Sequence, residues 1–108
     1  MTIDCPTPDQ IPALRRLWQQ AFGDTDRFLD GFFQTGFAPE RCRCLWEADN
    51  LAAALYWFDT EYGVNRFAYL CAVATDSAYR GQGFCHRLMA DTHAHLARLG
   101  YADRKSVV

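Results

Sequence analysis

One short segment of the sequence combines residue types that bind anions. Residues 73–86 read VATDSAYRGQGFCH, an apolar run followed by a polar turn with two glycines and then a helix-like pattern. Backbone N–H groups at a helix N-terminus are unpaired and carry the positive end of the helix dipole, so they attract phosphate. Gly81 and Gly83 leave room for a ligand, and Arg80 adds a fixed positive charge. The sequence therefore predicts a phosphate or pyrophosphate site from Arg80 to His86.

Three kinds of phosphate ligand could occupy such a site. A mononucleotide P-loop requires Gly, four residues and then Gly-Lys-Ser/Thr, which is absent. A dinucleotide fingerprint requires a third glycine where His86 stands, and it follows a parallel strand rather than hairpin-linked strands. Coenzyme A is the remaining candidate, and a glycine turn selected only for its geometry is the alternative without a ligand.

The cysteines and histidines offer other chemistry. Cys42 and Cys44 share one face of a strand, and a metal would need Cys71 and a histidine in addition, so we expect buried, inert thiols and no metal. The last predicted helix carries three histidines without a His-x-x-x-His pair, which gives no support for zinc. Cys85 stands at a helix N-terminus, where the dipole favours a thiolate, and a thiol enzyme that uses it is an alternative function.

Periodicity and turn residues predict an α/β order of elements that positions this motif. We expect strands at 1–6, 42–47, 51–58 and 66–75, and helices at 7–22, 24–34 and 83–99. Residues 51–58 are apolar on both faces, which is typical of a central strand. Residues 59–65 are predicted to be a turn, because Gly63 and Asn65 lie in a polar stretch.

Composition limits the class of protein. The chain has 108 residues, half of them apolar, which is enough for one small domain with a core. The net charge of −2 and the lack of a basic stripe argue against nucleic-acid binding, and no apolar run approaches the roughly 20 residues of a membrane span. Five cysteines with no signal peptide and no disulfide framework indicate reduced thiols and a cytoplasmic location.

The motif resembles a known family. Val73-Ala74-Thr75 followed by Tyr79-Arg80-Gly81-Gln82-Gly83-Phe84 is similar to the acetyl-CoA-binding motif of the GCN5-related N-acetyltransferases (GNAT), and closest to the enhanced-intracellular-survival type. The resemblance covers residues 1–102. It implies a GNAT-like mixed, mostly antiparallel sheet with helices on both faces. At the sixth motif position Cys85 stands where the family has Gly or Ala.

The resemblance also implies a function and a set of binding residues. The chain would be an acyltransferase that moves an acetyl group from acetyl-CoA, its cosubstrate, to an amine acceptor. The main chain of Val73, Ala74 and Thr75 would pair with the pantetheine arm, and the N–H groups from Gly81 to His86 would hold the pyrophosphate. The full list of predicted CoA-binding residues is Val73, Ala74, Thr75, Arg80, Gly81, Gln82, Gly83, Phe84, Cys85 and His86. No catalytic residue is assigned.

The acceptor stays open at this point. It could be an aminoglycoside-like polyamine, a protein lysine or a small metabolite, and Asp24, Asp26 and Asp30 could favour a cation. The full-length protein could form a homo-oligomer. A non-catalytic domain that binds CoA or a partner protein is the alternative from another class.

The end of the sequence gives a further expectation. Residues 103–108, DRKSVV, do not resemble the apolar strand that should follow Tyr101. They match the translation of a common sequencing adapter, so we expect 1–102 to be a partial, C-terminally incomplete acetyltransferase domain and 103–108 a spurious tail. The strand over 66–75 would then be an exposed edge, and we expect the 108-residue chain to be marginally stable and inactive.

Overall fold

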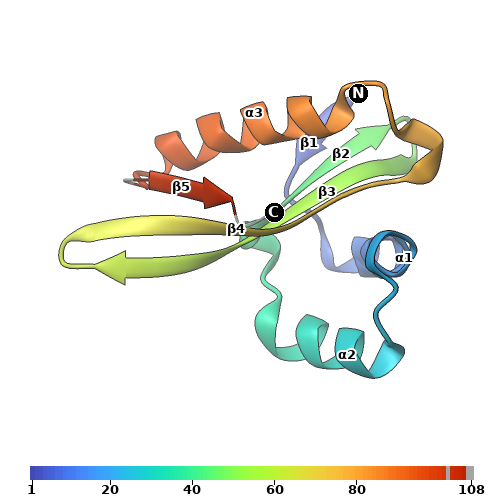
Figure 1. The fold of residues 1–108 in the computed structure, drawn as a ribbon, viewed down its shortest axis with the longest axis horizontal. Helices are drawn as coiled ribbons and strands as arrows, with labels where there is room; N and C mark the ends of the chain where they lie inside the picture. Colours follow the sequence, from blue (N-terminus) through green and yellow to red (C-terminus); the bar gives the residue numbers. More distant parts are fainter. Residues whose placement is uncertain (102, 107–108) are drawn as a thin grey trace.

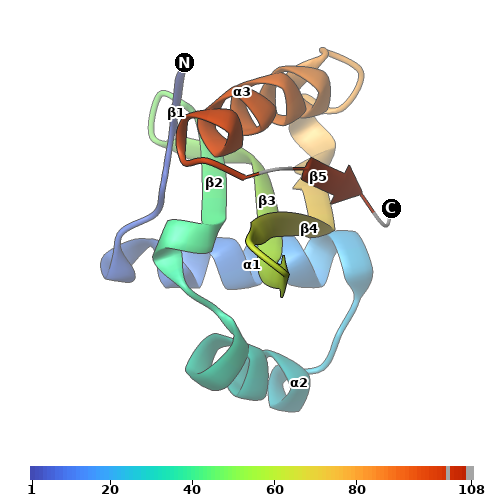
Figure 2. The ribbon, with the colours of Figure 1, turned by 90° about the vertical axis from the view of Figure 1, so that its left-hand side faces the viewer.

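A single twisted sheet separates the helices into two layers. The structure, a computed structural model, describes residues 1–101 and 103–106. Its strands are β1 (Thr2–Asp4), β2 (Cys42–Glu47), β3 (Asn50–Tyr62), β4 (Asn65–Thr75) and β5 (Asp103–Ser106), and its α-helices are α1 (Ile11–Phe22), α2 (Asp26–Gly31) and α3 (Phe84–Arg98). Figures 1 and 2 show α3 on one face of the sheet and α1 and α2 on the other. The predicted α/β fold with helices on both faces is confirmed.

The sheet is antiparallel except at one edge. The strand order is β1-β2-β3-β4-β5, with β1 to β4 antiparallel to their neighbours and β5 parallel to β4. β3 lies in the middle, as its apolar residues on both faces predicted. The antiparallel hairpins need only short turns, and β4 reaches β5 through α3, as a parallel pair requires.

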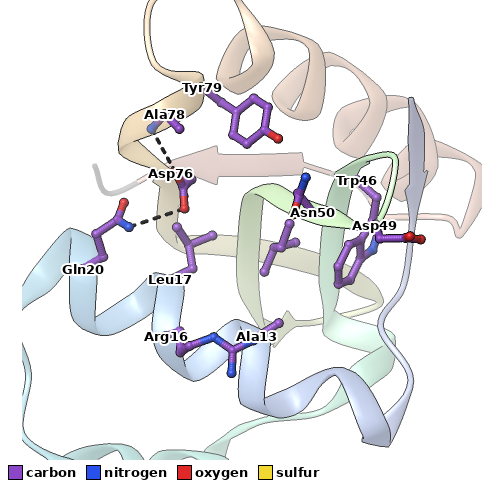
Figure 3. Close-up of a pocket in the computed structure, with 11 residues that line it drawn as sticks. Ala13, Arg16, Leu17, Gln20, Trp46, Asp49, Asn50, Asp76, Ala78 and Tyr79 are labelled. Atoms are coloured by element: carbon purple, nitrogen blue, oxygen red, sulfur yellow. Dashed lines mark hydrogen bonds between the residues drawn. The ribbon is translucent and has the colours of Figure 1, made fainter.

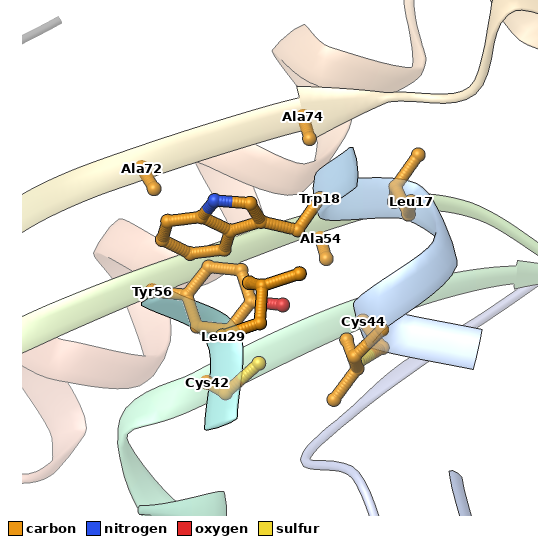
Figure 4. Close-up of a cluster of buried hydrophobic side chains, with 10 residues drawn as sticks. Leu17, Trp18, Leu29, Cys42, Cys44, Ala54, Tyr56, Ala72 and Ala74 are labelled. Atoms are coloured by element: carbon orange, nitrogen blue, oxygen red, sulfur yellow. The ribbon is translucent and has the colours of Figure 1, made fainter. Parts of the chain in front are cut away.

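Each face of the sheet has its own core. Alternate residues of a strand point to opposite faces, so Ala72 and Ala74 pack under α1 while Val73 packs towards α3. The core below α1 and α2 centres on Trp18, whose ring lies 5.0 Å from that of Tyr56 (Figure 4). The core below α3 contains Leu88, Leu96 and Trp57, among others. Burial of both faces of the sheet fixes the position of the β4–α3 junction.

The second helix is shorter than predicted. The pattern predicted a helix over 24–34, whereas α2 spans Asp26–Gly31 and a wider π-type turn follows over Phe32–Gly36. Thr25 caps α2, because its hydroxyl accepts a hydrogen bond from the N–H of Phe28 (3.2 Å). Asp24 lies outside the helix, and its carboxylate accepts a bond from the Trp18 indole N–H (2.7 Å). Asp24, the predicted first residue of this helix, therefore forms a contact with α1 instead of starting α2.

The β3–β4 hairpin is longer than predicted. Residues 59–65 were predicted to be a turn, but β3 runs to Tyr62, β4 starts at Asn65, and only Gly63 and Val64 lie between. Gly63 has φ of 64°, the left-handed conformation that a tight hairpin requires. The hairpin extends beyond the helices (Figure 1), so polar side chains along it contact water and do not show the alternation of a covered strand.

The strand at the C-terminal edge corrects a second prediction. Residues 103–108 were expected not to form a strand, yet Asp103–Ser106 pair with Phe67–Leu70 as β5. Backbone hydrogen bonds do not depend on side-chain polarity, which explains why DRKS can pair with β4. Residues 102, 107 and 108 lie outside the described part of the chain, and the proposed boundary after residue 102 stays a prediction.

Candidate functional site

The β4–α3 junction has the conformation of an anion-binding loop. After β4 ends at Thr75, a short 3-10 turn over Ser77–Tyr79 leads to Arg80 and the glycines. Gly81 and Gly83 have φ of 77° and 79°, a left-handed conformation that residues with a side chain rarely adopt. A Cβ atom added at either position would meet no protein atom within 4 Å. The loop therefore borders open space on the side from which a ligand could approach.

A run of unpaired N–H groups extends along this loop into the first turn of α3. Among the described residues, no N–H from Gly81 to His86 donates to a protein acceptor, and the first bond at the start of α3 runs from the N–H of Arg87 to the carbonyl of Gly83 (3.0 Å). The unpaired N–H groups from Phe84 to His86 are the free N-terminal donors of α3, a helix of 15 residues, and those from Gly81 to Gly83 belong to the loop before it. We call residues 81–86 the cradle. Its donors and the helix dipole favour a bound anion.

Arg80 is held beside the cradle. Its Nε donates to the carbonyl of Thr75 (3.2 Å), which leaves the outer guanidinium nitrogens free among the described contacts. Within the same loop, Nε2 of Gln82 makes a long contact to the carbonyl of Ala78 (3.5 Å). The ring of Tyr79 packs 5.7 Å from that of Phe84, which ties the loop to the first turn of α3. Arg80 thus adds a full positive charge to the partial charges of the cradle.

The strand that leads into the cradle has an open edge. β5 pairs with β4 only over Phe67–Leu70 in the described part of the chain. The next residue, Cys71, is an extra residue of β4, because Tyr56 pairs with Ala72 and Trp57 pairs with Leu70. Such a bulge increases the local twist and turns the strand. From Cys71 to Thr75, β4 therefore has no strand partner on its outer side among the described residues.

The register shows which backbone groups face that open edge. The N–H of Asp76 donates to the carbonyl of Ala52 (2.8 Å), so position 76 is one of the positions of this segment that hydrogen-bond to β3. Such positions alternate in an antiparallel ladder, so Ala74 and Ala72 also direct their backbone groups towards β3. Val73 and Thr75 direct theirs outwards. The geometry thus separates the three predicted pantetheine-binding residues: Val73 and Thr75 present free backbone groups, apart from the Thr75 carbonyl that Arg80 uses, and Ala74 does not.

A pocket of about 400 Å³ joins the open edge and the cradle. The predicted residues that line it are Val73, Ala74, Thr75, Arg80, Gly81, Gly83, Phe84 and Cys85. The predicted Gln82 and His86 are exposed and do not line it. Ala21 and Phe22, at the end of α1, form the opposite wall. No local pattern connects these two residues with a motif some 50 residues later, so their place in the pocket could not be predicted from the sequence.

The remaining thiols and histidines form no further centre in the described residues. All five cysteines are unpaired, and no group of three potential metal ligands occurs there. Burial raises the pKa of Cys42, with contributions from Cys44, and burial also raises the pKa of Cys71. These thiols are therefore protonated at neutral pH. Cys85 is exposed in the first turn of α3, and no described side chain hydrogen-bonds to its sulfur.

Glu61 and Tyr62 end β3 at the tip of the hairpin, the end of the sheet that is opposite to the cradle (Figure 1). No helix of the described residues is long and apolar enough to cross a membrane.

The sequence comparisons identify the family. The family model described as an acetyltransferase (GNAT) domain matches residues 2–102, which is nearly the whole chain. The chain therefore belongs to the GNAT acetyltransferase domain family. A comparison with curated proteins finds no match.

Solved structures share the fold at low sequence identity. A GNAT family acetyltransferase from Staphylococcus aureus is 14% identical with a TM-score of 0.80, over 99% of this chain and 85% of that one. An aminoglycoside N-acetyltransferase in complex with CoA is 13% identical with a TM-score of 0.77, over 99% and 76%. A transcriptional regulator from Bacillus halodurans is 15% identical with a TM-score of 0.79, over 99% and 81%. These likenesses support the fold alone, and the closeness to the enhanced-intracellular-survival type stays a prediction.

Proposed function

We propose that this GNAT domain binds acetyl-CoA in the pocket between α1 and the cradle, as the cosubstrate of acetyl transfer to an amine acceptor. The observation that carries the proposal is the run of free N–H groups from Gly81 to His86 beside Arg80. In this arrangement the pyrophosphate accepts bonds from the cradle, and the outward backbone groups of Val73 and Thr75 pair with the amides of the pantetheine arm. The CoA complex of the similar aminoglycoside acetyltransferase supports the choice of ligand.

The chemistry would consist mainly of positioning. Holding the amine against the thioester carbonyl replaces a bimolecular encounter with a reaction between fixed partners. The amine nitrogen forms the new amide bond, the CoA thiolate leaves, and the amine loses one proton to a base or to water. The described pocket assigns no side chain to that proton transfer, and the acceptor stays open among a polyamine, a protein lysine and a small metabolite.

Calorimetric titration with CoA and acetyl-CoA tests the proposal. Binding is the decisive measurement, because the proposal rests on the free donors of the cradle and on the charge of Arg80. The wild-type chain should bind both ligands, and Arg80→Glu should abolish measurable binding because it places a carboxylate against the pyrophosphate. Arg87→Glu, in the first turn of α3, is the matched control for the change of charge and should weaken binding less. A wild-type chain that binds neither ligand would refute the proposal.

A domain that binds CoA without catalysis is the second candidate. The observation in its favour is the pocket lining, which includes no carboxylate and no histidine among the described residues. The structural likeness to a transcriptional regulator agrees with this alternative. Release of free CoA thiol from acetyl-CoA in the presence of amines would distinguish the two functions. A thiol enzyme is the third possibility, and rapid alkylation of Cys85 at neutral pH without CoA binding would support it.

A further inference from the structure

A hydrogen-bonded bridge connects α1 to the loop before the cradle. Gln20 of α1 uses both ends of its side-chain amide: Oε1 accepts from the N–H of Ser77 (2.7 Å), and Nε2 donates weakly to Oδ2 of Asp76 (3.4 Å). Oδ1 of Asp76 accepts from the N–H of Ala78 (2.8 Å). Figure 3 shows the hydrogen bonds that link Gln20 to Asp76 and Asp76 to Ala78. Two segments more than 50 residues apart in sequence are joined here by polar contacts.

The bridge lies at the boundary between two pockets. Gln20 and Asp76 line a pocket of about 450 Å³ between α1 and the β2–β3 turn (Figure 3). Their neighbours in sequence, Ala21 and Thr75, line the pocket that contains the cradle. The bridge therefore fixes the distance between the two walls of the CoA pocket, one on α1 and one on the loop.

The bridge also sets the direction of the loop. Asp76 has a second fixed contact, because its N–H donates to the carbonyl of Ala52 in β3 (2.8 Å). Its carbonyl accepts from the N–H of Tyr79 (2.9 Å), which closes the 3-10 turn. From Arg80 to Gly83 the chain makes no backbone hydrogen bond to the sheet among the described residues, so the path of this segment depends on the turn. A turn released from Gln20 would leave the donors of the cradle less well aligned.

We propose that Gln20 is a positioning residue for CoA: its bridge to Asp76 and Ser77 holds the cradle at the spacing and orientation that bind the pyrophosphate. The inference rests on the proposed function, since it assigns the cradle to CoA. Preorganised donors bind an anion more tightly, because the free energy of ordering the loop has already been spent in folding.

Truncation of the side chain is the first test. Gln20→Ala should weaken CoA binding by about three- to tenfold in calorimetric titration, as expected from the loss of one good and one weak hydrogen bond. Gln19→Ala is the matched control: Gln19 is the adjacent glutamine of α1, and its Nε2 donates to Asp26 (2.6 Å), away from the cradle. Equal dissociation constants for the Gln20→Ala variant, the Gln19→Ala variant and the wild type would overturn the proposal.

An exchange of the two polar groups tests the bridge itself. Gln20→Glu alone places a carboxylate against Asp76, and Asp76→Asn alone directs an amide N–H₂ towards the N–H₂ of Gln20, so each should weaken CoA binding. The double variant restores all three bonds, because the new carboxylate accepts from Ser77 and from the new amide, whose oxygen accepts from Ala78. It also keeps the net charge. CoA binding should return to within about twofold of the wild type. A double variant as weak as the singles would overturn the proposal.

Hydrogen exchange in the free protein separates this inference from the proposed function. Gln20→Ala should speed amide exchange in the segment 76–79, whose N–H groups are hydrogen-bonded, and leave β2 and β3 unchanged, whereas Gln19→Ala should not affect that segment. If the wild type binds no CoA, the proposed function is refuted, and this measurement still decides whether Gln20 orders the loop. Unchanged exchange over 76–79 in Gln20→Ala would overturn the inference in either case.

Discussion

Gly81 and Gly83 show how single residues can determine the geometry of the site. Their positive φ angles set the path of the main chain before α3. A side chain at either position would strain the backbone, although an added Cβ atom would meet no neighbour. Arg80 contributes a charge, but the donors themselves belong to the main chain. The site is therefore sensitive to backbone conformation at two residues and less sensitive to the type of side chain at Gln82 or His86.

Replacement of one cradle glycine should separate strain from steric clash. We expect Gly83→Ala to lower the free energy of unfolding by about 1 kcal/mol through its left-handed φ, and to weaken CoA binding because the N–H of the next residues turns away. Urea denaturation and calorimetric titration measure the two effects. Gly31→Ala is the control, since Gly31 is helical with a negative φ and a clear Cβ position, and it should stabilise the chain slightly. A Gly83→Ala variant as stable as the Gly31→Ala variant would contradict this reading.

At the scale of elements, α3 connects the cradle to the sheet. Leu88 and Leu96 are fully buried on its inner side, and Thr92 lies between them. On the outer edge of this contact, the Arg43 guanidinium of β2 forms an ion pair with Asp91 (2.5 Å), and it makes longer contacts to the Ile3 carbonyl (3.5 Å) and the Cys5 sulfur (3.9 Å). A helix whose N-terminus binds a ligand must be fixed along its length, and these contacts provide that.

A cavity below α3 should therefore cost stability. Leu96→Ala should lower the free energy of unfolding by about 3 kcal/mol, because Leu96 is completely buried and its loss leaves a void against the sheet. Leu99→Ala is the matched control at the end of the same helix, where the side chain is 48% exposed, and it should cost less than about 1 kcal/mol. Chemical denaturation of both variants measures the difference. Similar losses from both would mean that α3 does not pack as described.

The same interface should respond to acid through His95. Burial, followed by the charges of Arg43 and Arg98, lowers the pKa of His95 below its usual value near 6.5, although Asp91 opposes this. The unfolded chain then binds more protons than the folded one between the two pKa values. Stability is therefore fully present above about pH 6.5 and falls as the pH drops through the folded-state pKa.

Denaturation between pH 7.5 and pH 5 measures this effect. His95→Gln should reduce the loss of stability on acidification, and Arg98→Gln should reduce it in part by removing one repelling charge. An unchanged pH dependence in the His95→Gln variant would show that other groups cause the acid response.

The limits of prediction are also seen at the scale of elements. Strong local signals predicted the elements that carry the site, although the first α-helix begins later than predicted. Thr7 precedes a 3-10 turn over Pro8–Gln10, α1 spans Ile11–Phe22, and Gly23 ends it. Gly81 and Gly83 mark the junction of β4 with α3. Contacts between distant segments were not predictable, because nothing local to Gln20 or Phe22 indicates a neighbour near residue 76. The bulge at Cys71 was missed for a similar reason, since it exists only relative to the register of β3.

For the whole molecule, the open edge of β4 links stability to ligand binding. The apolar segment 71–75 has no strand partner on its outer side among the described residues, and such edges promote association between molecules. A ligand that pairs with Val73 and Thr75 would cover this edge and bind only the folded chain. Aggregation and CoA binding should therefore be coupled, because both use the outer edge of β4 at Val73 and Thr75.

Saturation with CoA should thus stabilise the chain and keep it in solution. At a free concentration 100 times the Kd, binding to the folded state adds about 2.7 kcal/mol, which corresponds to a rise in Tm of about 10–20 °C for a domain of this size. Thermal unfolding followed by light scattering should show a higher Tm and a later onset of aggregation. Arg80→Glu should remove both effects, and adenosine, which lacks phosphate and pantetheine, should produce neither. A rise in Tm without delayed aggregation would mean that CoA binds the cradle but leaves the edge of β4 uncovered. The backbone pairing proposed for Val73 and Thr75 would then be wrong.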